Sequence, residues 1–262
     1  MENTPILKVY TNNNGRHLTD FFRCQIVHTI EESNVVFVGG GGDISHFLFP
    51  FEPVLNNLNS NRNTDLQDVK TIMRCLSLNK PIIGFNRGLI LLAALSGNYS
   101  EIYYSHNARG SRTVRIGDKT LDVYYPRHFC VNPRRSSDFL LGNSFNGRAD
   151  FYQRSKDHDR INSNDFKMGD SEVVLFTRLN ALGFAFEITS NEKMNFVSPV
   201  INDFMTKNKS DLISSYPCID MRDPKATTNP VDASHYMSNT SNRFAEFLIS
   251  HMNGLSIPPD LT

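Results

Sequence analysis

The sequence contains no tryptophan and only four cysteines in its 262 residues. The cysteines are far apart and form no C-x-x-C pair, so their spacing argues against a zinc knuckle and against a disulfide framework. We therefore expect reduced, mostly structural thiols. The four positions are Cys24, Cys75, Cys130 and Cys218.

An excess of charge is also missing. The 27 basic side chains balance 27 acidic ones, and the sequence pI is near 7.1. This balance argues against a protein held to nucleic acid or to an anionic membrane by its net charge. No window approaches the ~20 apolar residues of a membrane-spanning helix, and the polar N-terminal stretch lacks the order of a signal peptide. We expect a cytoplasmic protein without a membrane or nucleic-acid partner.

Two continuous apolar runs each end in a turn that contains glycine. Residues 34–43 read NVVFVGGGGD and residues 80–88 read KPIIGFNRG. Such runs are typical of strands buried on both faces of a parallel sheet. Helical periodicity follows each of them, over 64–78 and over 89–97. This alternation predicts an α/β fold with a doubly wound, mostly parallel sheet, in which ligands bind beyond the carboxyl ends of the strands.

The second half of the sequence has a different pattern. Short alternating runs fill 101–186, and Gly117-Asp118 predicts a hairpin within them. Residues 188–238 are polar, contain four prolines and show no convincing period, so we expect an insertion at about 189–238. A helical stripe at about 241–253 closes the chain. We expect one domain over 1–262 with these two features.

Three stretches, in this order, resemble the class I glutamine amidotransferase family, most closely its gamma-glutamyl hydrolase-like branch. NVVFVGGGGDISHFLF resembles the family's strand with its oxyanion-hole glycines. KPIIGFNRGLILLAALSG resembles the nucleophile-elbow motif K-P-x-x-G-x-C-R-G, and LGFAFEIT resembles the late strand G-x-Q-x-H-P-E. VYYPRHFCV is a weaker match to the strand V-N-S-x-H-H-Q. The resemblance implies a flavodoxin-like fold.

The resemblance fails at the residues that carry the family's chemistry. There an elbow cysteine attacks an amide carbon, a histidine transfers the proton and a glutamate orients the histidine. The matching positions here hold Asn86, Glu187 and Thr189. An amide is no useful nucleophile near neutral pH, and Glu187 has no thiol to deprotonate and no carboxylate behind it. The resemblance therefore implies that the three catalytic positions are degenerate and that no catalytic residue remains.

The surroundings of the elbow are better preserved. Asn tolerates strained turn conformations better than most residues, and Gly84 and Gly88 flank Asn86 as in the family motif. Phe129 stands where the family has glutamine, which implies loss of glutamine recognition. We expect a vestigial ligand-binding cleft formed by Gly40, Gly41, Gly42, Asn86, Arg87, His128 and Glu187.

Two other kinds of site find little support in the sequence. Cys130 follows His128 by two residues, but two side chains on one face of a strand are not thereby within hydrogen-bond reach. The histidines have no metal-ligand spacing, so we expect no metal and no cofactor.

These features favour a catalytically inactive glutamine amidotransferase-like protein that serves as a structural, assembly or partner-binding module, with a protein partner or as a homo-oligomer. The asparagine-rich composition makes a bacteriophage virion component conceivable. The alternative is an active amidohydrolase, or a small-ligand-binding protein, that uses the same cleft with non-standard residues.

Overall fold

The computed structural model describes residues 6–12, 24–45, 48–49, 54, 59–96, 100–108, 110–124, 128–133, 138–144, 149–162 and 170–216. Within these ranges the strands form a nine-stranded and a four-stranded sheet. The larger sheet has the order β2-β1-β3-β4-β13-β12-β9-β6-β7. Its strands are β1 (Leu7–Thr11), β2 (Cys24–Ile26), β3 (Val35–Gly39), β4 (Ile82–Phe85), β6 (Ser111–Ile116), β7 (Lys119–Tyr124), β9 (Asp138–Ser144), β12 (Asp170–Phe176) and β13 (Ala181–Phe184).

The strands from β2 to β13 in this order pair in parallel, and the remaining strands pair antiparallel. Every residue of β3 and β4 is buried, as expected for continuous apolar strands in the middle of such a sheet. The predicted α/β fold class is confirmed, as is the hairpin at Gly117-Asp118, which joins β6 to β7.

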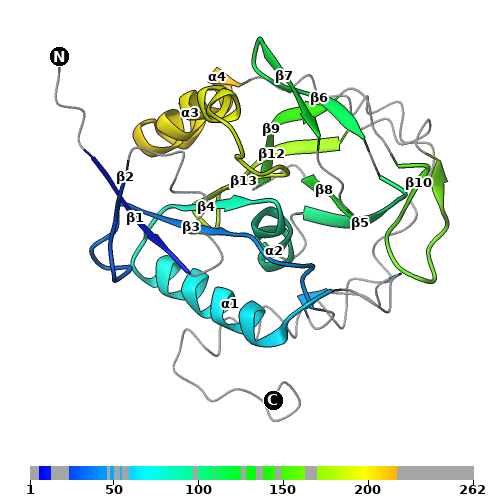
Figure 1. Cartoon of the computed structure of the whole chain (residues 1–262), viewed down its shortest axis with the longest axis horizontal. Coiled ribbons are helices and arrows are strands. Elements are labelled where there is room, and N and C mark those ends of the chain that lie inside the picture. Colours follow the sequence, from blue (N-terminus) through cyan, green and yellow to red (C-terminus); the bar gives the residue numbers. More distant parts are fainter. Residues whose placement is uncertain are drawn as a thin grey trace.

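Helices cover both faces of this sheet (Figure 1). One side carries α1 (Arg62–Ser77) and α2 (Arg87–Leu95), and the other carries α3 (Asn191–Thr206) and α4 (Lys209–Ser215). Side chains alternate along each strand, so one apolar layer packs against α1 and α2 and a second against α3 and α4. The predicted helices over 64–78 and 89–97 correspond to α1 and α2.

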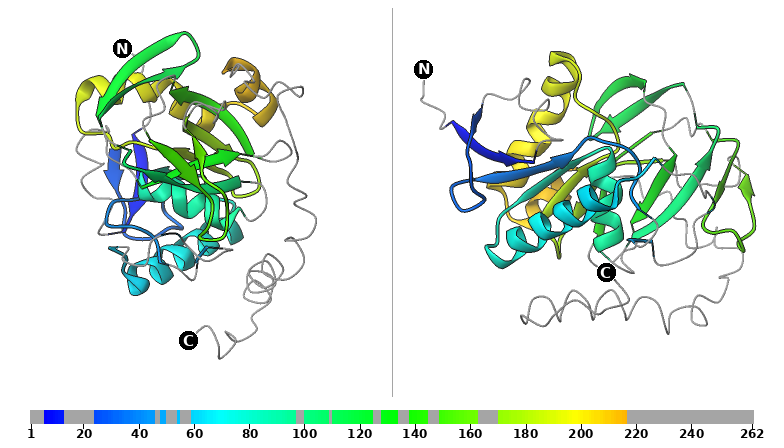
Figure 2. Two further views of the ribbon diagram at one scale, coloured as in Figure 1. Left: turned by 90° about the vertical axis from the view of Figure 1, so that its right-hand side faces the viewer. Right: turned by 60° about the horizontal axis from the view of Figure 1, so that its bottom comes forward.

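The smaller sheet, ordered β11-β10-β5-β8, lies beyond the antiparallel half of the large sheet, far from β1 and β2 (Figure 2). Its strands β5 and β8 pack against α2. The strands of this sheet are β5 (Ser100–His106), β8 (Phe129–Pro133), β10 (Phe151–Gln153) and β11 (Ile161–Asn162).

The irregular structure expected over 189–238 is corrected where the structure describes it. Residues 191–206 and 209–215 form α3 and α4. Ser190 caps α3 by accepting a hydrogen bond from the Lys193 N–H, and Phe196, Val197, Val200 and Ile201 are buried against the sheet. This part of the segment belongs to the packed core. Residues 217–238 and the expected helix at 241–253 lie outside the described residues.

In the ranges that the structure describes, no helix is long and apolar enough to cross a membrane.

Candidate functional site

The turn between β4 and α2 has the strained backbone that an elbow requires. Asn86 has φ 50° and ψ −106°, a region that L-residues other than asparagine and glycine rarely occupy. The turn is held because the Asn86 N–H donates to the Phe184 carbonyl at 2.7 Å. The Asn86 side chain makes no capping bond to the first turn of α2. The strained turn predicted from the sequence is therefore present.

The glycines around the elbow let the backbones approach closely. A Cβ on Gly88 would lie 2.2 Å from the Val38 carbonyl oxygen, and one on Gly84 would lie 2.8 Å from the Gly88 carbonyl carbon. The first turn of α2 thus rests directly on the backbones of β3 and β4. The spacing of glycines in the motif follows from this packing.

The two degenerate positions Asn86 and Glu187 are brought together. The Asn86 amide donates to the Glu187 carboxylate at 3.4 Å. Thr189 is exposed and accepts a hydrogen bond from the Lys193 ammonium at 2.8 Å. Burial lowers the pKa of Lys193, although the nearby Glu187 charge opposes this effect. An amide and a carboxylate thus face each other where the resembling family has a thiol and an imidazole.

The glycine loop after β3 turns sharply toward the elbow. Gly40 and Gly41 have φ values of 76° and 91°, which glycine adopts without strain. Gly42 lies against the chain at Asn59, since a Cβ there would lie 1.8 Å from the Asn59 carbonyl oxygen. The next residue, Asp43, donates its N–H to the same carbonyl at 2.9 Å.

Asp43 and His128 form a pair across the cleft mouth that sequence reasoning did not anticipate. The His128 Nδ1 lies 3.0 Å from Oδ1 and 3.3 Å from Oδ2 of Asp43. The Tyr104 hydroxyl is close enough that burial and the Asp43 charge together raise the pKa of Tyr104. We refer to the two residues as the Asp43–His128 pair.

A pocket of about 220 Å³ connects these parts. The glycine loop, the elbow and the Asp43–His128 pair form its polar wall, and apolar side chains form the remainder. Of the expected cleft residues, Gly41, Gly42, Asn86, Arg87 and His128 line it. Gly40 precedes the pocket, and Glu187 reaches it through Asn86. The complete lining is Gly41, Gly42, Asp43, Ile44, Asn59, Asn86, Arg87, Ile90, His128, Phe129 and Ala185.

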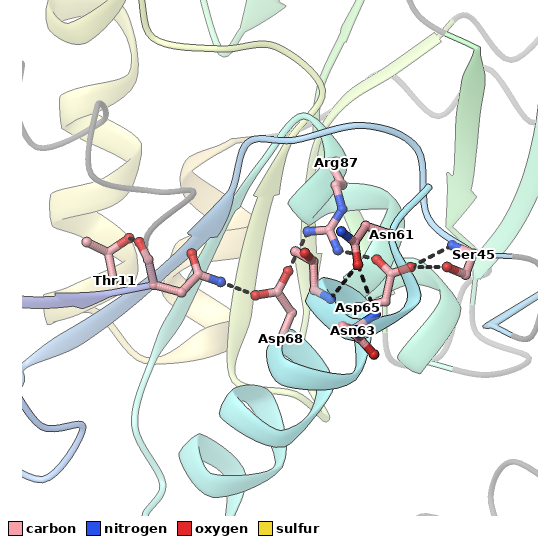
Figure 3. Close-up of polar contacts among 9 residues, drawn as sticks. Thr11, Ser45, Asn61, Asn63, Asp65, Asp68 and Arg87 are labelled. Atoms are coloured by element: carbon pink, nitrogen blue, oxygen red, sulfur yellow. Dashed lines mark hydrogen bonds and ion pairs between the residues drawn. The ribbon is translucent and has the colours of Figure 1, made fainter. Parts of the chain in front are cut away.

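The Arg87 side chain is committed to the interior. Its guanidinium forms ion pairs with Asp65 and Asp68 of α1, and both carboxylates are fully buried (Figure 3). Ser45 donates to Asp65 from its N–H at 2.8 Å and from its hydroxyl, and the Asn12 amide donates to Asp68. Arg87 therefore has no charge to offer a ligand, and its role is to join α2 to α1.

The pKa shifts in this cluster reflect its burial. Burial raises the pKa of Asp68 even though Arg87 acts in the opposite direction. Burial also opposes the charge of Arg87, but Asp68 and Asp65 more than offset it and raise the Arg87 pKa. From the sequence, Asp65 and Asp68 look like ordinary acidic residues near a helix start. The only local signal for their burial is that they lie next to the apolar stripe of α1.

Cys130 and His128 occupy different environments. The Cys130 side chain is buried in a small cluster with Ala108, Ala149 and Tyr152, whereas His128 lines the pocket. Among the described residues, no group of three or more His, Cys, Asp or Glu side chains is placed to hold a metal ion.

Comparisons with known proteins give likenesses of structure only. No family model and no curated protein sequence matches the chain. A solved candidate GMP synthase subunit from Thermoplasma acidophilum has a TM-score of 0.46 and 14% identity, covering 82% of this chain and 97% of its own. A glutamine amidotransferase from Thermotoga maritima has a TM-score of 0.45 and 11% identity, with 95% and 98% covered. A glutamine amido transferase from Methylobacillus flagellatus has a TM-score of 0.40 and 12% identity, with 98% and 97% covered.

Proposed function

We propose that this protein keeps a glutamine amidotransferase-like scaffold, of the gamma-glutamyl hydrolase-like branch, without its thiol reaction, and acts as a non-catalytic module. The observation that carries the proposal is Asn86 itself. It holds the strained φ of 50° but carries an amide that is bonded to Glu187. A thiolate nucleophile and an imidazole base are the groups that the family's reaction requires there. The retained strain serves the close packing of α2 on β3.

The proposal is tested by ammonia release from glutamine and from a gamma-glutamyl amide. We expect none from the natural chain. Asn86→Cys alone should also give none, because Glu187 and Thr189 supply neither the base nor the group that orients it. Appreciable turnover by that single variant would contradict the alignment of the late strand. Turnover by the natural chain that is lost in Glu187→Gln or Cys130→Ser would contradict the proposal itself.

A structural or assembly role, including that of a bacteriophage virion component, requires a protein partner or self-association. Such a role predicts a defined oligomer or a co-purifying complex. Light scattering after size-exclusion chromatography measures this, and a strictly monomeric chain at all concentrations would argue against self-assembly.

The second candidate function is small-ligand binding, and the pocket favours it. At about 220 Å³ it is smaller than the ~300–1,000 Å³ of pockets that hold drug-sized ligands. It combines the glycine loop, an uncapped helix start and a titratable pair with the apolar Ile44, Ile90 and Phe129. This mixture is typical of sites for small polar metabolites.

A further inference from the structure

The Asp43–His128 pair is built by the tertiary structure. Asp43 comes from the loop after β3 and His128 from the start of β8, 85 residues later. The Asp43 side chain is 16% exposed and that of His128 is 57% exposed. The half-covered carboxylate holds Nδ1, so Nδ1 carries the proton and Nε2 is the ring nitrogen that remains for another partner.

The charge of the pocket depends on this pair. Arg87 also lines the pocket, but Asp65 and Asp68 neutralise it. Among the described residues, the titratable groups near His128 are Asp43 and Tyr104. With a neutral imidazole the pair carries the negative charge of Asp43, and with a protonated imidazole it is neutral. Protonation of His128 therefore removes a negative charge from the wall of the pocket.

The opposite part of the pocket favours oxygen. The Gly41–Gly42 turn presents backbone to the pocket. The first turn of α2 begins at Asn86 without a side-chain cap, which leaves N–H groups with partial positive charge. These donors suit a carbonyl and a carboxylate alike. The titratable pair distinguishes the two, because only a charged ligand responds to its protonation.

We propose that the pocket binds a small carboxylate and that the Asp43–His128 pair couples this binding to uptake of one proton. One carboxylate oxygen accepts from the backbone donors and the other accepts from the protonated Nε2 of His128. The charge of the imidazolium then offsets Asp43, which would otherwise repel the ligand. This inference rests on the ligand-binding candidate above and names the ligand class for that site.

The test is calorimetric titration of the full chain with glutarate, with the uncharged glutaramide as the matched ligand. Histidine changes its charge between about pH 5 and 8, so glutarate should bind on the order of tenfold more tightly at about pH 6 than at about pH 8. Titration in buffers of different ionisation enthalpy should show proton uptake. Glutaramide should show neither effect. Absence of glutarate binding at the lower pH, or equal affinity at both, overturns the proposal.

Variants locate the effect. His128→Gln should abolish the pH dependence, whereas His28→Gln, at an exposed site before β3, should preserve it. Asp43→Asn removes the group that favours the imidazolium, so the midpoint of the pH dependence should move to lower pH. A pH dependence that survives His128→Gln overturns the assignment. Ammonia release from glutamine, measured on the same samples, shows separately whether the proposed absence of thiol chemistry holds.

Discussion

At the scale of single residues, Asn86 separates two properties of an elbow that usually occur together. Its backbone keeps φ at 50°, and its side chain is an amide bonded to Glu187. The backbone conformation is needed for α2 to start where it does, directly on β3. The chemistry of the side chain is independent of that requirement, so it can be replaced without loss of the turn.

The strain at Asn86 can be measured with two variants that both delete the amide. Asn86→Gly should be about 1 kcal/mol more stable than Asn86→Ala, because glycine relieves the positive φ by more than it gains in unfolded-state freedom. Urea unfolding of both variants gives the difference. An alanine variant as stable as the glycine variant would show that the turn is not strained.

Gly88 tests the close approach of α2 to β3. Gly88→Ala places a Cβ 2.2 Å from the Val38 carbonyl oxygen, and we expect a loss of about 3 kcal/mol or more in unfolding free energy. Gly110→Ala is the control, since Gly110 also has a positive φ but open space around it. It should lose only about 1 kcal/mol from backbone strain. Equal losses at both positions would contradict the packing argument.

At the scale of elements, the ion pairs of Arg87 join the start of α2 to the first turns of α1. The two buried carboxylates need this cation, because Ser45 and Asn12 supply hydrogen bonds without charge. The arrangement holds α1 and the glycine loop against the elbow, which sets the floor of the pocket.

We therefore expect Arg87→Met to destabilise the fold by about 3–5 kcal/mol, because it leaves two uncompensated buried carboxylates. Arg74→Met is the matched control. Its ion pair with Glu31 is half exposed on both sides, so its loss should change stability little. Thermal and urea unfolding compare the two. Similar effects from both variants would show that the buried cluster is not the main link between α1 and α2.

The element that sequence reasoning missed is α3. Its buried residues Phe196, Val197, Val200 and Ile201 do follow helical spacing. Pro199 and the polar residues around it obscured that spacing, because proline inside a helix removes a hydrogen bond and is read as a helix end. Here the apolar face packs on the sheet and outweighs that local cost.

At the scale of the whole molecule, Asp138 lies where the two sheets and α2 meet. It begins β9, is 1% exposed, and accepts from the Ser100 hydroxyl of β5 at 2.7 Å. Burial raises the pKa of Asp138 to about 6, and hydrogen bonds from Ser100 and Ser96 oppose that rise. The junction of the sheets therefore contains a carboxyl that is easier to keep protonated than to ionise.

This shift predicts the sign of a pH effect. The folded chain holds the Asp138 proton more tightly than the unfolded chain, so its contribution is full below about pH 4 and is lost as pH rises through about 6. Relative to Asp138→Asn, the natural chain should lose roughly 3 kcal/mol of unfolding free energy between about pH 4 and pH 8. Urea unfolding at both pH values measures the difference.

The second variant is Ser100→Ala, which removes a hydrogen bond to the carboxylate. It should raise the pKa of Asp138 further and therefore widen the pH effect. A difference between the natural chain and Asp138→Asn that stays constant with pH would contradict the burial argument.

The sequence alone determined the strands β3 and β4, the helices that follow them and the elbow between β4 and α2. These are local features, because continuous apolar runs, helical spacing and closely spaced glycines are all written within a few neighbouring residues. The α/β class and the strained Asn86 followed from them.

Only the tertiary structure decided which distant groups meet. Asp43 pairs with His128 across 85 residues, and Arg87 reaches Asp65 and Asp68 across 22 and 19 residues. Sequence patterns report whether a side chain is buried, but the partner of a buried or half-buried charge depends on how the sheets and helices pack. For that reason the scaffold was predictable, whereas the charges that line and support its pocket were not.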